Sequence, residues 1–440
     1  MMVGRYQAYP KYRSTDVKWL GDIPSEWKIC AIKHVSTLNP AKSKLRYQQG
    51  DECSFVPMEK LKTDSLVLDE IRPIADVYEG YTYFVDDDIL MAKVTPCFEN
   101  KNIAIAKDMV NGVGFGSSEI YVLRSNQKAN NRYLFYRLQD DGFMEVATSS
   151  MSGAGGLKRV PSDVLNNFLV ALPEYEEQIQ IANFLDHETA KIDSLIDKQQ
   201  QLITLLKEKR QAVISHAVTK GLNPDAPLKD SGVEWLGEMP EHWEEVRVKR
   251  LYKFAKRQGY KDLTVLSVYR EHGVIVKSTR DDNFNKTPEN LSVYQLVNKG
   301  DLAINKMKAW QGSMGISQHQ GITSPDYAVY RPLHDFADRY LHYWFRASHM
   351  PDVYRNISTG IRPSQWRLDL EEFEKLKVFL PPSTERSSIV REINAIEMKY
   401  LRLVELAEKQ IDLLQERRTA LISAAVTGKI DVRNWKPERR

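Results

Sequence analysis

The chain has 440 residues, enough for two to four domains with separate cores. Its hydrophobic content of 42%, charged content of 28% and net charge of +3 are ordinary for a globular protein, so net charge alone does not indicate a nucleic-acid partner. No apolar run approaches the roughly 20 residues of a membrane helix, and the start, Met1–Tyr6, lacks the apolar stretch of a signal peptide. We therefore expect a cytoplasmic protein with no membrane partner. Three widely spaced cysteines exclude a disulfide framework or a zinc motif and predict buried thiols.

The first half begins with a polar leader at residues 1–13, followed by a mixed domain at 14–173. In that domain short β-type runs alternate with turn signals, which predicts an α+β fold. We expect strands at 88–93 and 117–123 and a helix at 131–143.

Residues 174–221 form a predicted long helix, because no Gly or Pro occurs before the stop at Gly221 and apolar residues recur at heptad spacing. Leu185 and Ile192 belong to the apolar stripe. A helix of about 40 residues would be roughly 60 Å long. We expect it to break near 186–189, where apolar contacts are few.

After a predicted linker at 222–229 the same plan returns. A second α+β domain is expected at 230–381 and a second long helix at 382–428. The polar tail at 429–440 is predicted to be frayed.

The two halves share long stretches of sequence. The pattern Trp-Leu-Gly-x-x-Pro-x-x-Trp occurs at 19–27 and again at 235–243, and Pro173–Thr219 aligns without a gap with Pro381–Thr427. Two copies of a unit of roughly 200 residues predict a pseudo-twofold molecule. We expect the four tryptophans of the repeated pattern to be core residues rather than base-stacking groups.

The repeat also predicts how the helices pair. Each helix has an apolar stripe that needs a partner, and a twofold relation makes the two helices antiparallel. The predicted fold class is therefore α+β, with two mixed domains alternating with two long helices that form an antiparallel coiled coil. Gln199 and Gln410 interrupt the apolar seams; they either fix the register or face outward at a loose position.

Basic residues are concentrated in two stretches without acidic residues, at 27–50 and at 246–261. Because they recur at matching places in both copies, they favour a surface that faces phosphates. A merely solvated basic face is the alternative.

Catalytic signatures are weak. Gly428-Lys429 lacks the remaining residues of a phosphate loop, and Gly112–Gly116 precedes a strand instead of opening a helix. Leu380–Ser383 lacks the polar first and aromatic last residues of the amino-methyltransferase motif, and the nine histidines form no zinc-protease pattern. The sequence favours a reader or a scaffold over a catalyst.

These residues resemble the specificity subunits of type I restriction-modification systems over nearly the whole chain. The resemblance rests on the duplicated tryptophan pattern, on the Pro-x-x-x-Glu-Gln entry to the helix at 173–178, and on the related helix endings at 210–221 and 417–429. The second copy departs from the family pattern, with Arg386 in place of Gln178.

The resemblance implies a non-catalytic subunit with two target recognition domains separated by conserved helices. It implies double-stranded DNA as a partner, read as two half-sites separated by unspecified base pairs. It also implies two modification subunits, docked on the helices, and restriction subunits. No cofactor would be bound directly; S-adenosylmethionine, ATP and Mg²⁺ would belong to the partner subunits.

We predict DNA contacts at seven residues. Lys93 and Lys306 end matched strands, Lys158, Arg159 and Arg362 follow matched glycines, and Lys308 and Gln311 lie in a loop found only in the second copy. Arg and Gln can make bidentate contacts to base edges. Exposed Lys and Arg on any domain are the competing explanation.

Two other functional classes remain open at this point. One is an enzyme, either a nuclease or a DNA methyltransferase with degenerate motifs, which would act on DNA without partner subunits. The other is a coiled-coil adaptor without DNA affinity, which would not bind heparin or duplex DNA at low salt.

Overall fold

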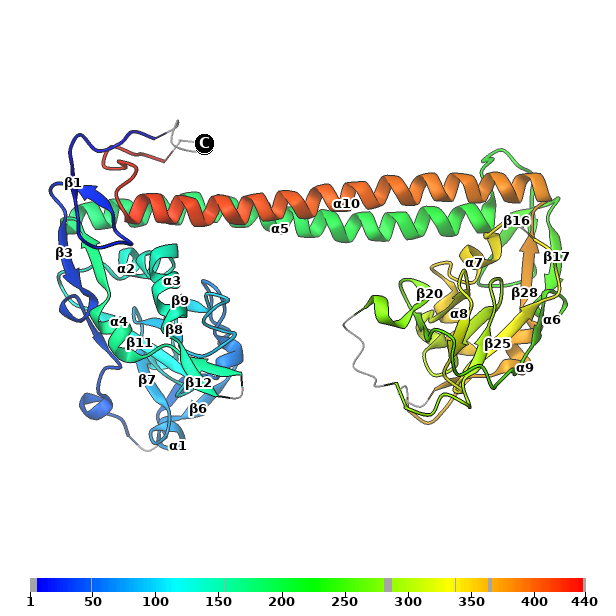
Figure 1. Ribbon diagram of the computed structural model, residues 1–440, viewed down its shortest axis with the longest axis horizontal. Helices are drawn as coiled ribbons and strands as arrows, with labels where there is room; N and C mark the ends of the chain where they lie inside the picture. The colour runs from blue at the N-terminus through cyan, green and yellow to red at the C-terminus, as the bar shows by residue number, and fades with distance from the viewer. Residues whose placement is uncertain are drawn as a thin grey trace. The chain divides into compact units, whose positions relative to one another are not determined.

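The computed structural model describes residues 6–48, 50–154, 156–280, 287–336, 338–362 and 366–437 (Figure 1). Residues 1–5 of the predicted leader and 438–440 of the predicted tail lie outside this description. The chain divides into two compact units, Met1–Gln199 with Lys409–Arg440, and Gln200–Glu408. Each unit therefore contains one mixed domain, called a reader below, and one half of each long helix. No helix in the described part of the chain is long and apolar enough to cross a membrane.

The first reader is built around two four-stranded sheets. One has the order β4-β11-β8-β9 and is antiparallel throughout; the other has the order β6-β5-β10-β7 and contains one parallel pair, β5 with β10. Three two-stranded ladders pair β1 with β2, β3 with β14 and β12 with β13. The strands are β1 Tyr12–Ser14, β2 Asp22–Pro24, β3 Lys28–Ala31, β4 Ser36–Leu38, β5 Glu52–Val56, β6 Ile71–Pro73, β7 Thr82–Val85, β8 Ile89–Ala92, β9 Ile103–Ile105, β10 Val113–Gly116, β11 Ile120–Ser125, β12 Ser152–Ala154, β13 Leu157–Arg159 and β14 Leu169–Leu172.

Strand β8 is buried on both faces, as its uninterrupted apolar sequence predicts. Successive side chains of a strand point to opposite faces. Ile89 and Met91 accordingly join the large core that includes α5, whereas Leu90 and Ala92 join a second core on the other side. In the second reader, Leu302 and Ile304 face the large core and Ala303 the smaller one. The strand that ends in a candidate lysine is therefore fixed from both sides in each reader.

The helix predicted at 131–143 is two helices, α2 (Asn131–Arg137) and α3 (Asp141–Ser149). The break occurs because Asp140 is the N-cap of α3 and accepts a hydrogen bond from the Gly142 amide at 3.0 Å. Arg137 forms a buried ion pair with the same carboxylate. The short helices α1 (Ile74–Val77) and α4 (Ser162–Asn167) complete this reader.

The second reader has a four-stranded antiparallel sheet of order β18-β25-β22-β23, surrounded by two-stranded ladders. Its strands are β15 Leu228–Asp230, β16 Glu238–Pro240, β17 Glu244–Arg247, β18 Tyr252–Phe254, β19 Leu266–Tyr269, β20 Gly273–Val276, β21 Gln295–Val297, β22 Leu302–Asn305, β23 Met314–Ile316, β24 Gly321–Thr323, β25 Tyr327–Pro332, β26 Ser358–Thr359, β27 Arg367–Leu368 and β28 Lys377–Leu380. Its helices are α6 Val248–Leu251, α7 Tyr340–Trp344, α8 Met350–Asn356 and α9 Leu370–Lys375.

The two long helices are α5 (Tyr175–Lys220) and α10 (Ser383–Val426), and their antiparallel pairing is confirmed within each unit. In the first unit Arg418 of α10 contacts Asp193 of α5, while Gln180, earlier in α5, donates to the carbonyl of Trp435 beyond the end of α10. Ile181, Leu185 and Ile192 share one core with Leu414 and Leu421. In the second unit Ile214 and Val218 share a core with Ile389 and Ile393.

One expectation about the helices is wrong, and for Gln410 the structure favours the outward-facing alternative. Helix α5 does not break at 186–189: the Thr189 hydroxyl donates to the Leu185 carbonyl at 2.7 Å, and Tyr136 of α2 donates to Asp186 at 2.8 Å, so the reader supplies contacts that the helix sequence lacks. Gln410 is exposed and Gln199 only half-buried, so Gln410 does not occupy a buried seam position.

The repeated tryptophan pattern joins each reader to its helix. Trp27 and Trp243 are buried, and their indole nitrogens donate at 3.2 Å to Glu177 and Glu385, in the first turns of α5 and α10. The first tryptophan of each pattern is only half-buried. The core prediction is therefore confirmed fully for the second tryptophan of each copy.

A tyrosine at the start of a reader helix makes the same junction in both units. Tyr133 donates to the carbonyls of Ala171, in β14, and Val426, at the end of α10, at 2.7 and 3.3 Å. Tyr340 donates to Val218, near the end of α5, and to Phe379, in β28, at 2.7 and 3.0 Å. Each hydroxyl thus bonds a helix-end carbonyl that lacks an intrahelical partner.

Two smaller expectations also need correction. The tail is not frayed over residues 429–437: Ile430 and Val432 are buried, and Trp435 packs edge-on against Phe184 with 5.4 Å between ring centroids. Of the three cysteines only Cys53 is buried; the other two are partly exposed.

Candidate nucleic-acid interface

In the first reader the fold brings Lys93 to the hairpin β12–β13. Lys93 follows β8 directly, and its carbonyl accepts a hydrogen bond from the Val160 amide at 2.9 Å. Two residues later, the Thr95 amide donates to the carbonyl of Lys158 at 3.0 Å. The predicted residues Lys93, Lys158 and Arg159 therefore lie together, although about 65 residues separate them in the sequence.

The second reader repeats this construction. Lys306 follows β22, and its carbonyl accepts a hydrogen bond from the Leu368 amide at 3.0 Å. Leu368 is the residue after Arg367 in the hairpin β26–β27. Val160 and Leu368 are separated by the same offset as Pro173 and Pro381. The two readers thus place a lysine at a buried strand end and an arginine-bearing hairpin side by side.

The charges at the first site are partly neutralised. Arg159 forms two hydrogen bonds of 2.8 Å with Glu119, and this guanidinium lowers the pKa of the Glu119 carboxyl below its ordinary value. The Lys93 ammonium lies 5.3 Å from the centre of the Tyr121 ring. Lys158 is exposed, and its neighbour Leu157 is more than half exposed.

At the second site burial, and after it the nearby Arg367, lowers the pKa of Lys306. The neighbouring positive charges of Lys306 and Arg367 favour an anionic ligand. Trp310 and Trp366 meet edge to face beside them, with 5.5 Å between ring centroids, and the Trp310 indole donates to the Met307 carbonyl at 3.1 Å.

The remaining predicted residues belong to the second reader. Lys308 is exposed and Gln311 half-buried; Gln311 ends the short 3₁₀ helix Ala309–Gln311 that carries Trp310. Arg362 is exposed in the loop between β26 and β27. No observation here tests a DNA contact by any of the seven residues, so these assignments stay predictions.

Sequence reasoning missed Arg367 and Trp366. The match between glycines in the sequence paired Arg362 with the first hairpin. The strand pairing instead makes Arg367 the counterpart of Arg159. Trp366, the residue before Arg367, is then the counterpart of Lys158. Extending the gap-free offset of the two prolines backward by 15 residues would have found both. Glu119 carried no signal, because only the fold brings it to Arg159.

Four residues of the two basic stretches have local partners. Lys28 pairs with Glu174, Lys33 with Asn167, and Arg257 with the buried Asp301. Lys42 donates to the Tyr78 carbonyl. These four side chains have local partners, and the phosphate-facing role of the two stretches stays a prediction.

Comparison with known proteins finds similar specificity subunits. Residues 24–205 match the family model described as the type I restriction modification DNA specificity domain. The chain is 33% identical over 196 residues to the type I restriction enzyme EcoEI specificity subunit of Escherichia coli, covering 44% of this chain and 32% of that relative. It is 21% identical to the putative MjaX specificity subunit of Methanocaldococcus jannaschii, covering 94% of this chain and 96% of the relative.

Solved structures have the same fold. The HsdS subunit from Thermoanaerobacter tengcongensis matches with a TM-score of 0.50 and 17% identity, covering 95% of this chain and all of that one. A chain from a solved type I R-M system gives a TM-score of 0.60 at 17% identity, covering 92% of this chain and 98% of that one. The chain spans about a third of the length of the Escherichia coli relative. The resemblance seen in the sequence motifs is confirmed, because residues 24–205 match the model of a type I DNA specificity domain.

Proposed function

We propose that this chain is the DNA sequence-recognition subunit of a type I restriction-modification complex, in which each reader binds one half-site of a bipartite target. The observation that carries the proposal is the duplicated site. In both readers a lysine at a buried strand end lies beside a hairpin that carries an arginine, and the first of these two sites lies within residues 24–205, which match the specificity-domain model.

The chemistry of the site suits duplex DNA. Lysine and arginine neutralise phosphates and release counterions, and exposed apolar side chains can contact base edges such as the thymine methyl group. Leu157 and Ile361 are more than half exposed on the two hairpins, next to the cations. The hairpins differ in sequence, so we infer that the two readers recognise different half-sites.

One reader alone offers few cations, and binding through one site would be weak. Linking two readers makes the second binding event intramolecular, which raises the overall affinity without new contacts. We infer that the paired helices set the distance between the half-sites. Half-sites about 34 Å apart, one turn of the duplex, present their major grooves on the same side.

The modification subunits would dock on the long helices. In the second unit Leu205, Met398, Leu401 and Leu406 are each more than half exposed on α5 or α10, and apolar surface of this kind is typical of protein interfaces. We infer that the chain itself is non-catalytic and that S-adenosylmethionine, ATP and Mg²⁺ bind to the modification and restriction subunits. Two modification subunits, one for each repeat, fit the duplicated sequence.

Mapping methylated adenines tests the proposal. The chain is co-expressed with a type I modification subunit from the same genome in a host that lacks other adenine methylases. We expect one bipartite motif with a fixed spacer, absent when either gene is omitted. Methylation without this chain, or a single continuous motif, would contradict the proposal. Adenine methylation by the purified chain alone would instead favour an enzyme.

A further inference from the structure

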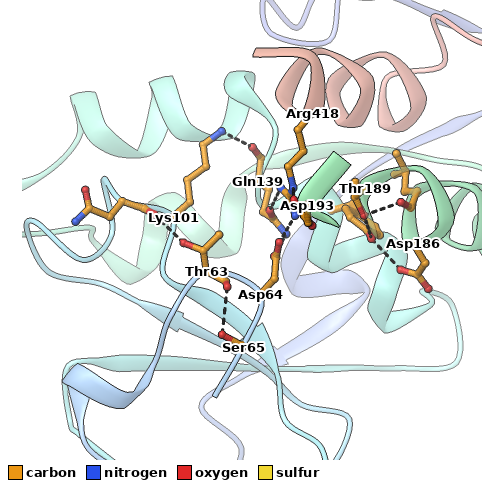
Figure 2. Close-up of polar contacts among 12 residues, drawn as sticks. Thr63, Asp64, Ser65, Lys101, Gln139, Asp186, Thr189, Asp193 and Arg418 are labelled. Atoms are coloured by element: carbon orange, nitrogen blue, oxygen red, sulfur yellow. Dashed lines mark hydrogen bonds and ion pairs between the residues drawn. The ribbon is translucent and has the colours of Figure 1, made fainter. Parts of the chain in front are cut away.

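Arg418 of α10 joins three parts of the first unit (Figure 2). Its Nε donates to Asp193 of α5 at 3.0 Å, its Nη2 to Asp64 in a loop of the reader, and its Nη1 to the Gln139 side chain at 3.4 Å. One guanidinium thus holds two carboxylates and one amide. A planar, permanently charged group suits this role because its donors have fixed directions.

The reader presents Asp64 in a constrained turn. Its backbone has φ of +58°, a left-handed conformation that Asp tolerates better than most residues. The Asp64 amide donates to the Ile103 carbonyl at 2.9 Å, and the Thr63 hydroxyl donates to the Asn100 carbonyl at 3.2 Å. Gln139 donates to the second oxygen of Asp64 at 3.1 Å. The carboxylate is therefore oriented by the reader before Arg418 contacts it.

The contact is partly shielded from water. The exposed fractions of the side chains are 15% for Arg418, 29% for Asp64 and 47% for Asp193. Burial raises the pKa of Asp64, and Arg418 opposes this rise by stabilising the carboxylate. Charge-assisted hydrogen bonds are stronger than neutral ones, and they weaken less with salt when partly buried.

The second unit lacks this arrangement. By the repeat offset Arg210 stands in the place of Arg418, and the exposed Leu401 in the place of Asp193. At the offset of 207 that relates Tyr133 to Tyr340, Arg346 stands in the place of Gln139, and it donates to the carbonyls of Met314 and Arg270 at 2.8 and 2.7 Å. The Nε of Arg210 is buried without a hydrogen-bond partner. Among the described residues of the second unit, the arginine that matches Arg418 has no acidic partner.

We propose that Arg418 is a positioning residue that fixes the angle between the first reader and the helix pair, and so makes the protein selective for the number of base pairs between the half-sites. This inference rests on the proposed function. A small domain is about 30 Å across. A tilt of about 10° would move its far edge by about 5 Å, more than the 3.4 Å step between base pairs. A loosened junction should therefore accept spacers one base pair longer or shorter.

The test compares Asp64→Asn and Arg418→Lys with the control Arg210→Lys, each co-expressed with the modification subunit. Methylated adenines are mapped for half-sites at the wild-type spacing and at one base pair more or less. We expect methylation at the altered spacings to rise about tenfold in the first two variants, as the loss of a charged hydrogen bond allows, with unchanged half-site bases. The control should keep the wild-type spacing.

Three results would overturn the inference. Asp64→Asn conserves the shape of the side chain but removes its charge. If this variant keeps the wild-type spacer selectivity, Arg418 does not act as a positioning residue. Equal relaxation in Arg210→Lys would indicate general loosening rather than this contact. If the variants methylate half-sites of altered base sequence, the Arg418 contact affects base recognition rather than spacer length. If the wild-type chain directs no bipartite methylation, the proposed function itself fails, and that outcome is distinct from the other three.

Discussion

Replacement of Tyr340 by phenylalanine should destabilise the second unit while leaving the first unit unchanged. The Tyr340 hydroxyl makes its shorter bond, 2.7 Å, with the carbonyl of Val218 near the end of α5, and a 3.0 Å bond with Phe379. Tyr133→Phe is the matched change in the first unit. There the shorter bond is with the strand carbonyl of Ala171, and the bond to the helix-end carbonyl of Val426 is 3.3 Å.

The expected magnitude follows from burial. Tyr340 and Val218 are fully buried, so water cannot replace the lost donor. An unsatisfied buried carbonyl costs about 1–3 kcal/mol, and in a unit of roughly 200 residues each kcal/mol lowers the melting temperature by about 2–4 °C. Tyr133→Phe should destabilise its helix end less, because the hydrogen bond that it removes there is 3.3 Å long, against 2.7 Å for the bond from Tyr340 to Val218.

Differential scanning calorimetry of the full chain measures this effect, since two units are expected to give two overlapping transitions. Tyr340→Phe should lower one transition and Tyr133→Phe the other. If both variants lower the same transition, the units do not unfold separately. If neither shifts by more than about 1 °C, the hydroxyl contacts do not stabilise the junctions and the reasoning is refuted.

Four further predictions concern charge, pH and helix length. Lys306→Ala should weaken duplex binding and reduce the slope of log K against log salt by about 0.9 if this side chain neutralises a phosphate, whereas Lys375→Ala should not change the slope. Glu119→Gln should free Arg159 and strengthen nonspecific binding at low salt in a filter-binding assay; weaker binding would mean that Glu119 orients Arg159 usefully. Burial lowers the pKa of His349 to about 4, so the unfolded chain binds more protons. The second unit should lose stability as pH falls from about 6.5 toward 4, and His349→Gln should reduce that loss in acid titrations followed by circular dichroism. Inserting one heptad into each long helix should lengthen the methylated spacer by about three base pairs, since seven residues rise about 10 Å; an unchanged spacer would exclude the helices as the ruler.

Several features of the fold were predictable because they depend on local sequence. The heptad spacing and the absence of Gly and Pro predicted both long helices, and the duplication predicted their antiparallel pairing. The break between α2 and α3 was missed because apolar spacing alone does not reveal that Asp140 caps a new helix. The packing of Trp435 was missed because its partner, Phe184, lies in α5, some 250 residues earlier.

The sequence by itself determined the duplicated architecture, the paired helices and the resemblance to type I specificity subunits, since periodicity and repeated motifs are properties of neighbouring residues. Only the tertiary structure decided which charges meet. It brought Lys93 to the β12–β13 hairpin, paired Arg159 with Glu119, and joined Arg418 to Asp64, a residue 354 positions earlier. The physical reason is that a charged side chain acts over a few ångströms, and the strand pairing and helix docking that set those distances are formed between segments far apart in the chain.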